Sequence, residues 1–200
     1  MASDPIRDPK ADRLLTPQNA AFIIIDYQPV QVNSIASIDR QLLLNNIVGC
    51  AKAAVAYGLP VMHGDADTDL QHYPDGAFDY VVLSRTLQAV ERPRAVLAQM
   101  LRIGTRAVVS FPNFGHWLVR WQLLSTGRMP MTSTWDRPWH ETPNIHPCTI
   151  RDFFALCAEE GYQVETWLAV DDAGRRAPWR RFPGLANLFG EQGLFVLRRL

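Results

Sequence analysis

Apolar runs bounded by turn residues alternate with helical periods along most of this chain. The clearest example spans 64–113, where a short acidic loop precedes an apolar run at 78–83. A helical period follows from 91–93 to Gly104, and a second apolar run covers 107–111. Two such runs joined by a helical period are typical of a βαβ unit in a parallel sheet.

The first third of the chain repeats this pattern. The β-branched run at 21–25 predicts a strand covered on both faces. A helix is expected to begin at Ser37 or Asp39 and to end at Gly58, before a short strand at 59–62. The helix keeps its apolar positions on one face, namely Leu43, Ile47, Val48, Ala51 and Val55. Strand, helix and strand together predict a right-handed parallel crossover.

Beyond the second apolar run, a helix is predicted over 116–125. Leu118, Trp121 and Leu124 recur at helical spacing, which favours a place in the core, with an exposed stripe for a partner protein as the alternative. The proline-rich segment 129–147 is too long for a simple connection, which indicates a functional or mobile loop.

The C-terminal part of the chain predicts a capped helix and two strands. Thr149 is placed to cap a helix that runs to about Glu160, and strands are expected at 162–170 and 193–199. The alternation of strands and helices predicts an α/β fold. We expect a three-layer Rossmann-like sandwich with a mostly parallel sheet and an antiparallel C-terminal edge.

Composition limits the function classes. Two hundred residues fit one domain, 1–200, in which the charged segment 1–13 is expected to form a loose arm. A formal net charge of zero offers no general attraction for nucleic acid or a membrane surface. Cys50, Cys148 and Cys157 have no C-x-x-C spacing, and the N-terminus lacks an apolar signal segment. We therefore predict a cytoplasmic protein without a membrane span.

Ligands of parallel sheets bind beyond the carboxyl ends of the strands, so the residues that follow the predicted strands are the candidate site. Several blocks around these ends are long and unusual: GDAD, PDGAFDYVVLSRTLQAV, VVSFPNFGHW, GRMP, TPNIHPCTIRDF and NLFGE. With these blocks, the chain from about Gly64 to Leu200 resembles the methionine biosynthesis protein MetW family, which has the S-adenosylmethionine-dependent methyltransferase fold.

The resemblance implies a seven-stranded sheet, S-adenosylmethionine as cofactor and a role beside homoserine O-acetyltransferase. It places Asp65 against the adenine amino group, Ala66 beside the adenine ring and Ser84 at the methyl-donor end. Asp26 would bind the ribose hydroxyls. The family's glycine-rich loop of the form D-x-G-x-G-x has no counterpart, because the chain contains no G-x-G. Close backbone approach to a ligand needs such glycines, so we expect impaired cofactor binding.

Residues 8–61 resemble a different family, the N-terminal part of isochorismatase-like cysteine hydrolases, with the motif LLTPQNAAFIIIDYQPVQVNSI. The chain therefore looks like a chimera of 14–63 and 64–200, joined near 61–64. In the hydrolase alternative Asp26 would be the proton-accepting acid beside a nucleophilic cysteine.

The hydrolase alternative also needs a lysine, but neither Lys10 nor Lys52 follows the hydrolase pattern. A third alternative is a non-catalytic interaction scaffold. Pro143 separates His140 and Glu141 from His146, which breaks the helical spacing of a zinc motif, so we predict loop histidines and no metal site.

Overall fold

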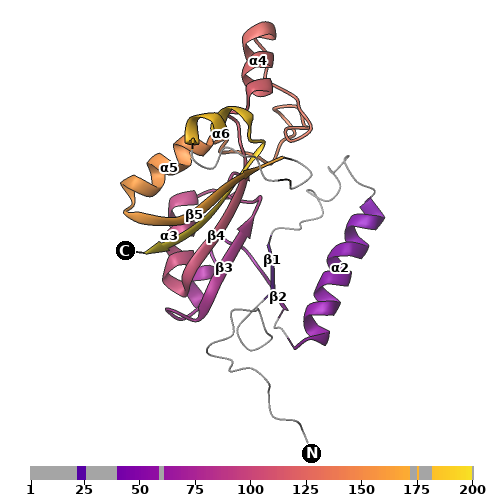
Figure 1. Ribbon diagram of the computed structural model, residues 1–200. Helices are drawn as coiled ribbons and strands as arrows, with labels where there is room; N and C mark the ends of the chain where they lie inside the picture. The colour runs from indigo at the N-terminus through magenta and orange to yellow at the C-terminus, as the bar shows by residue number, and fades with distance from the viewer. Residues whose placement is uncertain (1–21, 26–39, 59–60, 172–174, 176–181, 200) are drawn as a thin grey trace, which may run out of the picture.

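The computed structural model describes residues 22–25, 40–58, 61–171, 175 and 182–199 (Figure 1). The elements are β1 (Phe22–Ile25), α2 (Arg40–Ala56), β2 (Val61–Gly64), the 3₁₀ turn η1 (Leu70–His72), β3 (Phe78–Ser84), α3 (Pro93–Ile103), β4 (Gly104–Pro112), α4 (Trp117–Thr126), α5 (Ile150–Glu159), β5 (Tyr162–Val170), α6 (Pro183–Phe189) and β6 (Gln192–Arg199). The predicted order of strands and helices is confirmed. The sequence pattern missed α6 and η1, which are both short, and the predicted arm at 1–13 lies outside the described residues.

The strands form two sheets. β1 and β2 pair in parallel, whereas the larger sheet has the order β3-β4-β6-β5. β3 and β4 are parallel, and β6 lies between β4 and β5, antiparallel to both. The α/β class with antiparallel C-terminal strands is therefore confirmed. The described residues contain six strands in two sheets, where the family resemblance implied one seven-stranded sheet.

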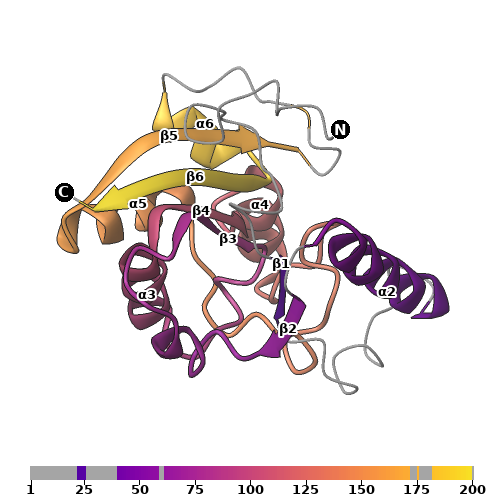
Figure 2. The ribbon, with the colours of Figure 1, turned by 90° about the horizontal axis from the view of Figure 1, so that it is seen from below.

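Helices cover the strands from two sides. α3 and α2 lie on opposite sides of the strands, which gives the predicted layered arrangement (Figure 2). α5 lies on the same side as α3 and packs against β5. No helix in the described part of the chain is both long and apolar enough to cross a membrane.

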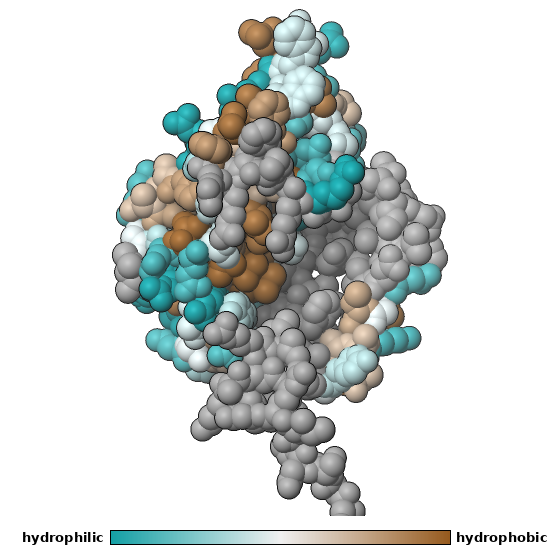
Figure 3. Space-filling view, viewed as in Figure 1, coloured by the Kyte–Doolittle hydropathy of each residue, from teal (hydrophilic) through white to brown (hydrophobic). Residues whose placement is uncertain are grey.

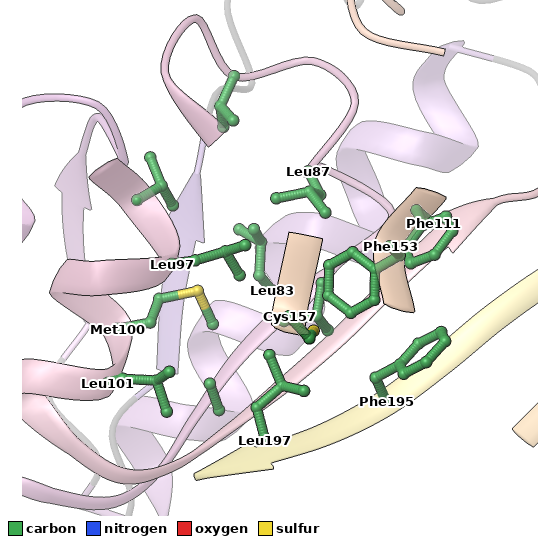
Figure 4. Close-up of a cluster of buried hydrophobic side chains, with 14 of the residues drawn as sticks. Leu83, Leu87, Leu97, Met100, Leu101, Phe111, Phe153, Cys157, Phe195 and Leu197 are labelled. Carbon is green, nitrogen blue, oxygen red and sulfur yellow. The ribbon is translucent and has the colours of Figure 1, made fainter. Parts of the chain in front are cut away.

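The hydrophobic core lies between the four-stranded sheet and helices α3 and α5 (Figure 4). Alternate residues of the strands point into it, including Leu83, Val109 and Phe195. Phe111 and Phe153 meet with ring centroids 4.9 Å apart, and Phe153 and Phe195 with centroids 4.6 Å apart. This aromatic cluster joins β4, α5 and β6 into one body.

The opposite face of the same sheet is much less covered. Val82 of β3 is 60% exposed, and Tyr80 two residues earlier is also exposed. Apolar side chains are visible over these strands near the centre of Figure 3. Within the described residues β3 is also the edge of its sheet, since its ladder is with β4 alone. Strands of this type are normally buried on both faces, whereas the described residues leave this side of the sheet largely uncovered.

α2 does not bury the apolar face that its sequence predicts. Val48 and Val55 are exposed, and Ala54 is the buried residue among the side chains described. The side chains of Leu43 and Ile47 lie outside the described residues. Among its described side chains, α2 therefore buries little apolar surface.

Candidate functional site

The carboxyl ends of the parallel strands define the candidate site. Ser84 at the end of β3 is in register with Ser110 of β4, so these two ends are adjacent. In the smaller sheet Ile25 is in register with Gly64, at the ends of β1 and β2. Asp26, predicted to bind ribose or to act as a hydrolase acid, lies outside the described residues.

The acidic loop after β2 is organised by its own carboxylates. The backbone N–H of Asp67 donates to Asp65 Oδ1 at 2.8 Å, and the N–H of Asp65 donates to Asp69 Oδ2 at 2.8 Å. The Asp67 carboxylate accepts the backbone N–H groups of Glu91 and Arg92, both at 2.9 Å. The loop is thereby fixed to the segment that starts α3, and one oxygen of Asp65 is already engaged in a turn.

Ala66 lies between these carboxylates but points into the protein. It is 3% exposed and belongs to the core cluster that also contains Leu83. Its methyl group therefore offers little surface to an adenine ring in this conformation. The adenine-binding role of Asp65 and Ala66 stays a prediction.

The turn after β3 holds the backbone in an unusual conformation. Arg85 has a φ of 54°, in the left-handed region that a side chain with a Cβ rarely adopts. Its N–H donates to the carbonyl oxygen of Ser110 at 2.9 Å and to Ser110 Oγ at 3.0 Å. The Ser110 hydroxyl lies 3.4 Å from Ser84 Oγ. The structure thus brings Ser84 beside Arg85 and Ser110, which also stand at the predicted strand ends.

Gln88 completes this turn. Its Nε2 donates to the Arg85 carbonyl at 2.6 Å, which fixes the orientation of the amide. Among the described residues, Gln88 Oε1 and Trp135 Nε1 are the buried side-chain polar atoms without a hydrogen-bond partner. A buried acceptor without a donor is costly unless a ligand or water supplies one. The strained backbone and this acceptor mark the end of β3 as the most unusual local structure of the site.

The turn after β4 is stabilised by the side chain of one buried asparagine. Asn113 Nδ2 donates to the carbonyl oxygens of Asn187 and Gly190, and Oδ1 accepts from the N–H groups of Gly115 and Ile150. A Cβ at Gly115 would lie 2.7 Å from Asn187 Oδ1, so only glycine fits there. One buried amide thus joins β4, α5 and α6. A lone Asn after a buried strand gave no signal of this role.

A pocket of about 620 Å³ opens between the first turns of α3 and α5. Its apolar residues include Leu87, Pro93, Ala95, Phe153 and Leu156, with Arg92, Arg94, His146, Cys148 and Asp152 around them. The charged groups already have partners. Arg94 pairs with Glu159 and Glu160, and Asp152 forms a reciprocal capping box with Thr149.

The two cysteines of the four-stranded body are poor candidates for a nucleophile. Burial raises the pKa of the Cys148 thiol to about 12, with a further contribution from Asp152, and burial alone raises the pKa of Cys157 to about 12. A protonated thiol is a poor nucleophile. No group of three His, Cys, Asp or Glu residues is arranged to hold a metal in the described ranges.

The residues present fit S-adenosylmethionine only in part. Asp65 and Ser84 stand at strand ends, as the resemblance implies, but on two separate sheets. The glycine-rich loop that would hold the methionine end has no counterpart in the sequence. The set does not fit the cofactor well enough to support a methyl-transfer step.

Over 126 residues the chain is 36% identical to the bifunctional methionine biosynthesis protein MetXA/MetW of Rhodopirellula baltica, a match that covers 62% of this chain and 20% of that protein. The chain thus spans about a fifth of the length of this relative.

Among solved structures, an S-adenosylmethionine-dependent methyltransferase from Mesorhizobium loti is similar, with 15% identity, a TM-score of 0.48 and coverage of 90% of this chain and 80% of that chain. A SAM-dependent methyltransferase from Aquifex aeolicus has 12% identity, a TM-score of 0.47 and coverage of 88% and 68%.

The model of the family described as "Methionine biosynthesis protein MetW" matches residues 35–197. This match begins before α2 and includes β2, so the resemblance to this family starts well before residue 64, where the sequence motifs placed its beginning. The hydrolase resemblance and the chimera receive no support from these comparisons. With more than three quarters of its length matched, the chain belongs to the MetW family.

Proposed function

We propose that this chain acts in methionine biosynthesis as a MetW protein that works beside homoserine O-acetyltransferase and binds S-adenosylmethionine weakly. Family membership supports the pathway. The relative from R. baltica combines a MetW unit with a second unit in one bifunctional chain, which supports a partnered role. The family resemblance implies which partner, and the cysteine pattern favours a cytoplasmic location.

One observation supports the proposal that the cofactor binds weakly. The two strand pairs that would flank a cofactor belong to separate sheets, and the sequence contains no G-x-G to close the site around a ligand. A glycine-rich turn supplies closely approaching backbone N–H groups that few side chains can replace. The body that carries the other strand ends is well packed, so the deficit is confined to one side of the molecule.

The partnered role is tested with the purified full chain and the homoserine O-acetyltransferase of the same organism. We expect the two proteins to elute together from a sizing column and the rate of acetyl transfer to homoserine to change when the chain is added. Addition of S-adenosylmethionine should leave that effect unaltered. Separate elution together with an unchanged rate would overturn the proposed role.

A further inference from the structure

α4 carries an apolar stripe that remains exposed among the residues that the structure describes. Trp117, Trp121 and Leu124 recur at the i, i+4 and i+7 positions of one helical face and are 47%, 59% and 81% exposed. Val119 is the buried residue of the helix and lies on the other side. The helix projects beyond the rest of the molecule, and apolar and near-neutral side chains gather over it (Figures 1 and 3). The expectation that Trp121 and Leu124 belong to the core is therefore wrong.

The stripe is held in a defined shape. Gly127 ends α4 with a φ of 62°, a conformation that favours glycine. The returning chain is tied to the helix, because the N–H of Met131 donates to Gln122 Oε1 at 2.8 Å. Met129 and Met131 are exposed beside the helix. Tryptophan and methionine on a preformed surface are typical of the central part of a protein interface.

The charges near the stripe indicate the chemistry of the surface that would bind it. Arg120 lies within α4 and Arg128 follows its C-terminal end, and the sequence has no acidic residue between Glu91 and Asp136. A second copy of this chain would bring like charges together across a two-fold interface, which is unfavourable. A groove with an apolar floor and a carboxylate rim would match both the stripe and the two arginines.

We propose that α4 is the docking helix for homoserine O-acetyltransferase and that the stripe Trp117, Trp121 and Leu124 enters an apolar, acid-rimmed groove of that protein. This inference rests on the proposed function, and the unit joined to MetW in the bifunctional relative supports it. The three side chains expose roughly a few hundred Å², less than the ~800 Å² that each partner buries in a standard interface. α4 is therefore the anchor of a larger contact.

The test measures binding of the acetyltransferase to the wild-type chain and to two stripe variants, Trp121→Glu and Leu124→Glu. We expect each to weaken binding at least about tenfold, as for a central interface residue. Val55→Glu is the matched control, because Val55 is 62% exposed on α2, and its binding should stay within about twofold of wild type. Arg128→Glu should weaken binding and reduce its dependence on salt.

The outcomes separate the two proposals. If the wild-type chain does not bind the acetyltransferase, the proposed function fails and the docking helix fails with it. If the wild-type chain binds and the stripe variants bind equally well, only the docking helix is overturned. Self-association of the wild-type chain that Trp121→Glu abolishes would identify a second copy as the occupant and would also overturn it.

Discussion

The four-stranded body and helix α2 differ in how much of their apolar surface the described residues bury. The body buries an aromatic cluster and satisfies a central amide with four hydrogen bonds. On α2, by contrast, the apolar residues Val48 and Val55 face solvent. This contrast in burial supports the proposal that the chain binds S-adenosylmethionine weakly although its four-stranded body is well packed.

Thiol reactivity should show the largest contrast between the two regions. Cys50 is exposed on α2, whereas the pKa values of Cys148 and Cys157 rise from 9.0 to about 12. At pH 8 this shift lowers their thiolate fraction about a thousandfold. A chromogenic disulfide reagent should therefore titrate one thiol quickly in the native chain and three in denaturant. Cys50→Ser should remove the fast phase, and three fast thiols in the native chain would contradict the buried body.

The same shifts predict a pH dependence. Between about pH 9 and 12 the folded chain keeps these two thiols protonated while the unfolded chain loses their protons. Their contribution to stability is therefore complete below pH 9 and is lost as the pH rises toward 12. The free energy of unfolding, measured with urea, should therefore fall less steeply with pH over this range in a Cys148→Ala, Cys157→Ala double variant than in the wild-type chain.

Phe111→Ala tests the packing of the body. The ring is fully buried and meets both Phe153 and Phe195, so its loss should lower the free energy of unfolding by about 3–5 kcal/mol. Val55→Ala on the exposed face of α2 should change it by less than about 0.5 kcal/mol. Urea denaturation measures both. Equal losses in the two variants would show that α2 is packed as tightly as the body.

Asn113→Ala should have the next largest effect and lower the free energy of unfolding by roughly 3 kcal/mol. This value is the upper end of the cost of leaving buried hydrogen-bonding groups without a partner. Its side chain serves two carbonyl oxygens and two N–H groups of α5, α6 and the intervening turns. Asn144→Ala, a loop position whose side chain makes no hydrogen bond in the described structure, is the control and should be near neutral. A loss below about 1 kcal/mol for Asn113→Ala would show that the junction is dispensable.

Among these variants of the four-stranded body, Thr149→Ala should lower the free energy of unfolding least. Thr149 Oγ1 accepts the N–H of Asp152 at 3.1 Å and caps α5, and such caps contribute about 1 kcal/mol. Ser133→Ala, at an exposed loop position, should leave the unfolding midpoint unchanged. If both variants unfold at the wild-type midpoint, the capping box adds nothing to stability.

Local sequence signals predicted most elements of the fold. Thr149, Pro93 and Gly127 marked helix ends, and the apolar runs marked β3 and β4. Sheet order was harder, because the position of β6 between β4 and β5 depends on long-range pairing that period-2 patterns do not encode. The exposure of Trp121 was missed for a related reason, since helical spacing identifies an apolar face but not whether the same chain covers it.

The candidate site was only partly accessible from sequence. Asp65 and Ser84 could be located because they follow apolar runs, whereas the left-handed backbone of Arg85 and the unpaired acceptor of Gln88 arise from three-dimensional contacts. The start of the family resemblance was placed too late, near residue 64, because α2 fits the strand–helix–strand pattern of either family.

The central claim is that the cofactor side of this MetW chain is reduced while its body is intact. Calorimetric titration of the folded full chain with S-adenosylmethionine tests it most directly, with Asp65→Ala measured in parallel. We predict no saturable heat below about 1 mM, which corresponds to less than about 4 kcal/mol of binding free energy. Micromolar binding by the wild-type chain that is lost in Asp65→Ala would contradict the account and establish a working cofactor site.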